Sequence, residues 1–82
     1  MHFTLYSRGY CHLCDDMLQA LQAFGITQAF TIEVVDVDAD AVLVARYDEW
    51  VPVLMASRDG EPPVQLCHYF LDEPKLRAFL ES

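Results

Sequence analysis

Cys11 and Cys14 are the residues of this sequence whose type and spacing most directly indicate chemistry. They lie in the stretch YSRGYCHLCDDM (residues 6–17) of an 82-residue chain, and Cys67 is the third cysteine. Cysteines separated by two residues occur in redox-active dithiols, in halves of zinc sites and in structural crosslinks. Zinc needs two more ligands, and the sequence offers only Cys67 and scattered histidines. We interpret the pair as redox-active, with a metal-binding pair and an inert buried pair as the alternatives.

The expected secondary structure gives the two cysteines unequal roles. From Cys11 on, apolar residues recur at intervals of three and four, which predicts a helix whose buried face carries Cys14. Cys11 then precedes the helix, where backbone N–H groups and the helix dipole lower a thiol pKa from about 8.5 toward about 3.5–7.5. We expect Cys11 to attack and Cys14 to resolve. Arg8 adds a cation near the sulfur, whereas Asp15 and Asp16 oppose a thiolate.

The first half of the chain predicts alternating strands and helices. His2–Tyr6 alternates β-formers and predicts a strand, and Gly25 would end the helix that follows the cysteines. Phe30–Val37 is more continuously apolar, so we expect a second strand that is covered on both faces. Asp38 or Asp40 would cap a second helix. The first strand, helix and second strand then form a parallel unit with a right-handed crossover.

The second half predicts a hairpin and a closing helix. Val51–Ala56 and Val64–Phe70 are apolar runs joined by an Asp-Gly turn signal at residues 59–60, which predicts antiparallel strands. A helix from about Glu73 closes the chain. The order β-α-β-α-β-β-α predicts one α/β domain over residues 1–82, a four-stranded mixed sheet with helices on both faces.

These features together resemble a glutaredoxin, and more narrowly the small bacterial glutaredoxin-like proteins of the thioredoxin superfamily. The resemblance lies in LYSRGYCHLC (residues 5–14) before a helix, in VPVL (residues 51–54) after a second helix, and in the terminal hairpin and helix. It implies a thioredoxin-like fold and a thiol-disulfide oxidoreductase that acts in cell redox homeostasis. It also implies a cis peptide bond between Val51 and Pro52, lying against the cysteine pair.

The resemblance also indicates substrate-binding residues. Val51, beside Pro52, would offer backbone groups to a peptide or to glutathione, in the manner of an added strand. Arg8 matches a basic residue that helps to hold the glutathione carboxylate. Tyr10 and His12 flank the first cysteine and are candidates for the same groove, although Tyr10 is equally compatible with a packing role.

The sequence departs from the glutaredoxin pattern at two places. His12-Leu13 replaces the Pro-Tyr that is common between the cysteines, which leaves the direction of the redox reaction open. The stretch CHYFLDEPKL (residues 67–76) lacks the Gly-Gly turn that grips the γ-glutamyl end of glutathione. Asp72 or Glu73 could stand near the acidic position of the glutathione motif, but we expect them to cap the last helix instead. We expect Cys67 to be a small buried apolar side chain. We expect no bound cofactor, and glutathione stays open as the reductant.

Composition and charge limit the classes of partner. The chain has 5 basic and 13 acidic residues, a formal net charge of −8, which argues against nucleic acid and anionic membranes. No apolar run approaches the roughly 20 residues of a membrane span, and the N-terminus lacks the features of a signal peptide. We expect a cytoplasmic monomer that reacts with a disulfide-containing protein or a glutathione mixed disulfide and with a dithiol reductant. The alternative functions are a non-enzymatic thiol module for a metal or an iron–sulfur cluster, and a redox-silent binding domain.

Overall fold

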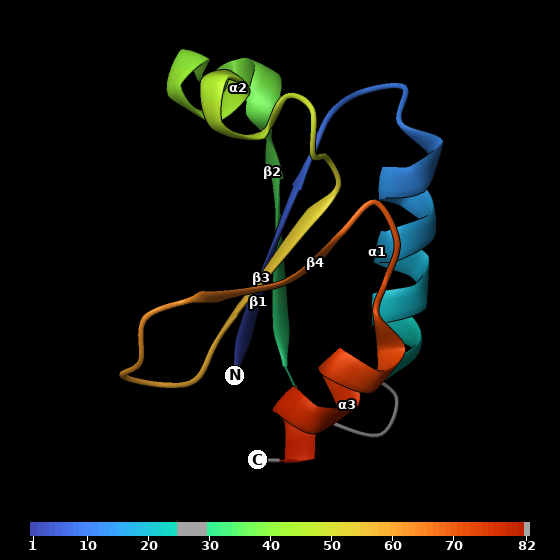
Figure 1. The fold of residues 1–82 in the computed structure, drawn as a ribbon, viewed down its shortest axis with the longest axis vertical. Coiled ribbons are helices and arrows are strands. Elements are labelled where there is room, and N and C mark those ends of the chain that lie inside the picture. Colours follow the sequence, from blue (N-terminus) through green and yellow to red (C-terminus); the bar gives the residue numbers. More distant parts are fainter. Residues whose placement is uncertain (25–29, 82) are drawn as a thin grey trace.

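The computed structural model describes residues 1–24 and 30–81 of the chain. The elements in chain order (Figure 1) are β1 (His2–Ser7), α1 (His12–Phe24), β2 (Thr31–Asp36), the 3-10 helix η1 (Val37–Ala39), α2 (Ala41–Tyr47), β3 (Val53–Ser57), β4 (Val64–His68) and α3 (Glu73–Glu81). This order confirms the predicted α/β arrangement. The helix stop predicted at Gly25 lies outside the described residues.

The four strands form one mixed sheet in the order β2-β1-β3-β4. β1 runs parallel to β2 and antiparallel to β3, and Leu5 of β1 pairs with Val34 on one side and Leu54 on the other. Because β3 runs antiparallel beside β1, the start of β3 lies next to the end of β1. This topology brings the loop that precedes β3 next to the loop that carries Cys11.

Helices α1 and α3 cover one face of the sheet and build the core there. The buried side chains of this core are Phe3, Leu5, Met17, Leu21, Leu54, Ala56, Leu66, Leu76 and Phe79. Burial of each large apolar side chain contributes about 1.5–3 kcal/mol. Phe3 also makes edge-to-face contacts with Phe30 and Phe79, with ring centroids 4.7 and 6.1 Å apart. This core holds α1 in place, and with it the helix end that carries the cysteines.

Helix α2 lies on the opposite face of the sheet, where Tyr47 stacks on Tyr6 with ring centroids 4.5 Å apart. Asp40 caps α2 as predicted, because its carboxylate accepts a hydrogen bond from the Val42 N–H at 2.8 Å. No side chain of α2 is fully buried. Neither α2 nor another helix in the described part of the chain has the length and apolar character to cross a membrane.

Strand β2 is an edge strand, which corrects one prediction. The sequence predicts that Phe30–Val37 is covered on both faces, but Val34 keeps 51% of its surface exposed. Phe30 and Val37 also lie outside the observed strand. The prediction of two covered faces is wrong because the strands that contribute buried side chains to the core are β1, β3 and β4, which leaves the outermost strand half open. The valines of β2 therefore indicate a preference for the strand conformation, not burial on both faces of the sheet.

Both strands of the hairpin differ from their predicted limits. β3 begins at Val53 rather than at residue 51, since Pro52 has no N–H to donate to a neighbouring strand. β4 ends at His68 rather than at Phe70. The chain turns there because Tyr69 adopts a left-handed conformation with φ of 62°. Phe70 therefore leaves the sheet and is exposed to solvent.

The hairpin turn and the cap of the closing helix are as predicted. Gly60 adopts a positive φ of 79°, which glycine accommodates without a steric penalty. The Glu61 N–H closes the turn by donating to the Arg58 carbonyl at 3.0 Å. At the start of α3, the Asp72 carboxylate accepts a hydrogen bond from the Lys75 N–H at 3.1 Å.

Candidate functional site

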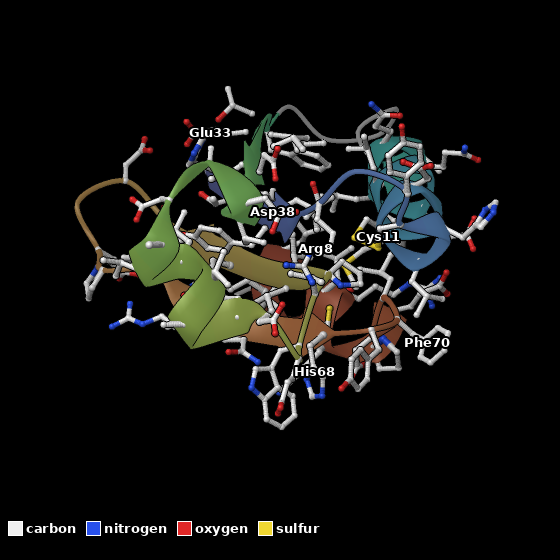
Figure 2. All side chains as sticks on the ribbon, turned by 90° about the horizontal axis from the view of Figure 1, so that it is seen from above. Arg8, Cys11, Glu33, Asp38, His68 and Phe70 are labelled. Carbon is white, nitrogen blue, oxygen red and sulfur yellow. A yellow bond between two sulfur atoms is a disulfide. The ribbon has the colours of Figure 1, made fainter. Side chains whose placement is uncertain are left out.

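The cysteine pair lies at the N-terminal end of α1. Cys11 and Cys14 form a disulfide with their Cα atoms 5.2 Å apart. Cys14 is 3% exposed and faces the core, whereas Cys11 is only partly buried. Figure 2 looks onto this end of the molecule and labels Cys11. The more accessible sulfur is therefore that of Cys11, in agreement with the exposure expected from the helix spacing.

The backbone at the start of α1 is directed toward the Cys11 sulfur. The Cys14 N–H donates a hydrogen bond to Cys11 Sγ at 3.1 Å. The first helical bond runs from the Asp15 N–H to the Cys11 carbonyl at 3.2 Å. A hydrogen bond from the backbone stabilises a sulfur anion more than a neutral thiol, and the positive end of the helix dipole has the same effect. This geometry is compatible with the thiolate expected at Cys11 from its place before the helix, and that activation stays a prediction.

Tyr10 and His12 lie on either side of Cys11, and with Asp15 they line an open hollow of about 360 Å³ around it. Tyr10 adopts a positive φ of 59° and its side chain is fully exposed. A bulky residue in the left-handed region is uncommon and marks a tight turn. Tyr10 therefore does not pack in the core, which removes the packing role left open by the sequence and leaves its ring available beside the cysteine.

Arg8 follows β1 and is held by two carboxylates. Its Nη2 donates to Asp38 Oδ1 at 2.7 Å, and its Nη1 lies 2.8 Å from Asp48 Oδ1. The hydrogen bonds to Asp38 and Asp48 raise the pKa of Arg8 above its ordinary value. Arg8 and Asp38 lie together in Figure 2. The guanidinium thus joins the end of β1 to the α2 region, and its expected role toward a thiolate or a carboxylate of glutathione stays a prediction.

The loop before β3 contains the Val51–Pro52 peptide bond, which is cis. Pro52 is buried, and its carbonyl accepts a hydrogen bond from the Tyr69 N–H at 2.9 Å. The Val51 N–H donates to the Tyr47 carbonyl at 3.2 Å. These bonds fasten the loop to α2 on one side and to the end of β4 on the other. The Val51 N–H already has a partner, so an incoming peptide would have to use other groups or displace this bond.

An aromatic cluster that the sequence analysis missed lies beside this loop. Trp50 contacts His68 edge-on at 5.3 Å and stacks on Tyr69 at 6.3 Å between ring centroids. His68 and Tyr69 are 4.7 Å apart. The Tyr69 hydroxyl donates to the Glu49 carbonyl at 2.6 Å. In a regular strand, the side chains of residues 68 and 69 would lie on opposite faces of the sheet. The left-handed turn at Tyr69, which no sequence pattern indicates, brings these rings together.

Cys67, the third cysteine, lies apart from the pair, in β4, and is half-buried against the core. Burial raises the pKa of its thiol, while a hydrogen bond from the Asp72 backbone acts in the opposite direction. Within residues 1–24 and 30–81, no group of three or more His, Cys, Asp or Glu side chains is arranged to hold a metal ion.

The fold and the cysteine pair together define a thioredoxin-like protein with a candidate dithiol site. The model of the family described as "Glutaredoxin-like domain (DUF836)" matches residues 2–81, and the chain belongs to this family. This agrees with the resemblance found in the sequence. No curated protein matches the chain.

Three solved structures illustrate the relationship. Protein Ne2328 from Nitrosomonas europaea is 35% identical, with a TM-score of 0.80 over 95% of this chain and 88% of its own. Protein XcR50 from X. campestris is 38% identical, with a TM-score of 0.63 over 96% of this chain and 95% of its own. Thioredoxin 1 from Thermosipho africanus is 18% identical, with a TM-score of 0.65 over 99% of this chain and 96% of its own. The last similarity shows the shared fold alone.

Proposed function

We propose that this protein is a thiol-disulfide oxidoreductase in which Cys11 is the nucleophile and Cys14 the resolving thiol. The observation that carries the proposal is the hydrogen bond from the Cys14 N–H to Cys11 Sγ at 3.1 Å, at the opening of a helix. It stabilises a charge on the more accessible sulfur while the second sulfur stays buried within bonding reach. An exposed attacking thiolate and a sheltered second thiol are what disulfide exchange requires.

In the proposed reaction the reduced protein gives two electrons to a disulfide. The Cys11 thiolate attacks one sulfur of the substrate, the substrate S–S bond breaks, and the departing sulfur takes up a proton. Cys14 then loses its proton and attacks Cys11 Sγ, which releases the second substrate thiol and forms the Cys11–Cys14 disulfide. A dithiol protein or two molecules of glutathione would reduce this disulfide again and close the cycle.

The setting proposed for this cycle is the cytoplasm, where thiols are kept reduced and a close cysteine pair is more often catalytic than structural. The reverse direction, oxidation of a partner dithiol, uses the same two steps in opposite order. The reduction potential decides between the two directions. A titration of the Cys11–Cys14 pair against glutathione and against a thioredoxin couple measures that potential and identifies the better reductant.

Trapping of the intermediate tests the proposal directly. Cys14→Ser keeps the nucleophile and removes the resolving thiol, so it should accumulate a mixed disulfide with a small disulfide such as bis(2-hydroxyethyl) disulfide. Cys11→Ser should form none at residue 14 and should lose turnover. Cys67→Ser, a cysteine outside the pair, is the matched control and should turn over as the unaltered protein does. Equal trapping by both single variants of the pair would overturn the assignment of roles.

A further inference from the structure

A groove begins at Leu13, between the two cysteines, and runs between α1 and the connection from β4 to α3. Its volume is about 260 Å³. Figure 1 shows this connection passing beside α1. Leu13 lines the groove from α1, and Tyr69 and Phe70 line it from the connection between β4 and α3. The groove is therefore continuous with the cysteine motif but separate from the hollow that surrounds Cys11 itself.

The groove presents large apolar side chains to solvent, and hydrogen bonds hold the turn on one side of it. Phe70 is 69% exposed and Leu13 is 36% exposed, although both are large apolar side chains. The turn that presents Phe70 is fastened through Tyr69, whose N–H donates to the Pro52 carbonyl at 2.9 Å and whose hydroxyl donates to the Glu49 carbonyl at 2.6 Å. A non-glycine residue at positive φ persists only where its surroundings hold it, and such positions gather at binding sites. The held backbone at Tyr69 thus keeps the exposed ring of Phe70 at the groove.

The charged groups at the groove are acidic. Asp16 and Glu73 line it, Asp15 lies in the neighbouring hollow, and no Lys or Arg of the described chain lines either. Glu73 makes a surface ion pair with Arg77 at 3.8 Å, whereas none of the ion pairs among residues 1–24 and 30–81 involves Asp15 or Asp16.

The arginine that precedes the cysteine motif does not offset this charge. Arg8, in the loop on the other side of Cys11, is already matched by two carboxylates, Asp38 and Asp48. The whole chain carries a formal charge of −8. An approaching cation is therefore attracted to the cysteine motif, and an approaching anion is repelled.

We propose that this groove binds a segment of a substrate polypeptide that carries an aromatic or apolar residue next to a Lys or Arg, close to the substrate disulfide. The apolar residue would lie against Phe70 and Leu13, and the cation would lie near Asp16. The inference rests on the proposed function and adds the substrate class to it. The preferred substrates are protein disulfides with a Lys or Arg close to them. Glutathione, with two carboxylates and one ammonium, meets an unfavourable charge and has nothing to place against the ring.

The test compares three cyclic disulfide peptides that differ only next to one cysteine, where they carry Phe-Lys, Phe-Glu or Ala-Lys. The measured quantity is the rate at which the reduced protein is oxidised, read after an acid quench and thiol labelling. The Phe-Lys peptide should react about tenfold faster than the Phe-Glu peptide at low salt, and the ratio should shrink at high salt. The Ala-Lys peptide should fall between them.

Two variants locate the effect within the groove. Asp16→Asn should reduce the preference for Phe-Lys over Phe-Glu, and Asp59→Asn, the same charge change at the distant hairpin turn, should leave it unchanged. Phe70→Ala should react with Phe-Lys no faster than with Ala-Lys. Circular dichroism checks that each variant is folded. The rate with each peptide is divided by the rate of the same variant with bis(2-hydroxyethyl) disulfide, which is small and neutral, so that a change in the reactivity of Cys11 itself cancels.

The outcomes separate this inference from the proposed function. Equal rates for all three peptides, together with normal reactivity toward bis(2-hydroxyethyl) disulfide, would overturn the groove as a binding site and leave the oxidoreductase intact. A preference that survives both Asp16→Asn and Phe70→Ala would also overturn it. Loss of reactivity toward every disulfide, including the small one, would overturn the proposed function itself.

Discussion

The backbone N–H of Cys14 donates to Sγ of Cys11 at 3.1 Å, so the residue proposed to resolve the intermediate also stabilises the charge of the nucleophile. We predict that Cys11 of the reduced protein titrates below the ordinary thiol value of about 8.5. The rate of its alkylation by iodoacetamide, followed across a pH series by mass spectrometry of the labelled peptides, measures this. A Cys11 that titrates like a thiol in an unfolded peptide would contradict the proposed activation.

Cys67 gives an internal comparison in the same experiment. Burial raises the pKa of its thiol, so the reactive thiolate forms only at higher pH than in an unfolded chain. We expect Cys67 to react slowly at neutral pH, and faster only above the ordinary range of cysteine. The thiol pKa values of Cys11 and Cys67 should therefore shift in opposite directions from that of free cysteine. After denaturation in urea both should return to one common titration curve.

Arg8 supports a prediction about stability. Removal of its guanidinium leaves Asp38 and Asp48 facing each other without their shared cation, so Arg8→Ala should lower the thermal midpoint of unfolding. The loss should be smaller at high salt, which screens the interactions of exposed charges. Arg8→Lys should recover only part of the lost thermal stability, because lysine lacks the forked guanidinium. The matched control is Arg77→Ala, which removes a surface ion pair with Glu73 and an exposed contact over the Phe24 ring and should lower the midpoint less.

Leu54 of β3 is fully buried in the core of the protein. Leu54→Ala should lower the free energy of unfolding by about 2–5 kcal/mol, since it removes buried methyl groups and leaves a cavity. Urea denaturation followed by circular dichroism measures the change. Val42→Ala, a truncation on the exposed side of α2, should stay within about 0.5 kcal/mol. Similar losses for both variants would contradict the described core.

The cap of α3 can be tested by a single substitution. Asp72→Ala removes the carboxylate that accepts the Lys75 N–H at 3.1 Å and should destabilise the protein by about 1 kcal/mol. Asp72→Ser keeps a capping oxygen and should retain most of that stability. Urea denaturation of the three proteins side by side gives the comparison. A serine variant as unstable as the alanine variant would show that Asp72 acts through something other than the cap.

Local patterns in the sequence were sufficient for the fold. The helix spacing from Cys11, the cap at Asp40 and the glycine turn at residue 60 each determine their own neighbourhood, and all three are observed. The exposure of β2 could not be read in the same way. A run of apolar residues reports β-propensity, but whether a strand is covered depends on which strands lie beneath the helices, a property of the whole assembly.

The candidate site was only partly predictable for the same reason. The cysteine pair is a local motif, and its asymmetry follows from one helix. The partners of Arg8 are Asp38 and Asp48, which are 30 and 40 positions away in the chain, so only the folded topology brings them to it. The sequence predicts Phe70 at the end of a strand, because no local pattern indicates the left-handed turn that the structure shows at Tyr69. Long-range pairs and unusual backbone conformations are what the sequence alone leaves out.

The half-open margin of the sheet has a consequence for behaviour at high concentration. Among residues 1–24 and 30–81 no strand pairs with the outer side of β2, and the backbone donors and acceptors of such an edge can template a strand from another molecule. Glu33 and Asp36 lie on this strand, so two copies approaching edge to edge would bring like charges together. The acidic composition thereby opposes intermolecular β-pairing. Acidification that protonates these carboxylates would weaken this protection and favour aggregation along that edge.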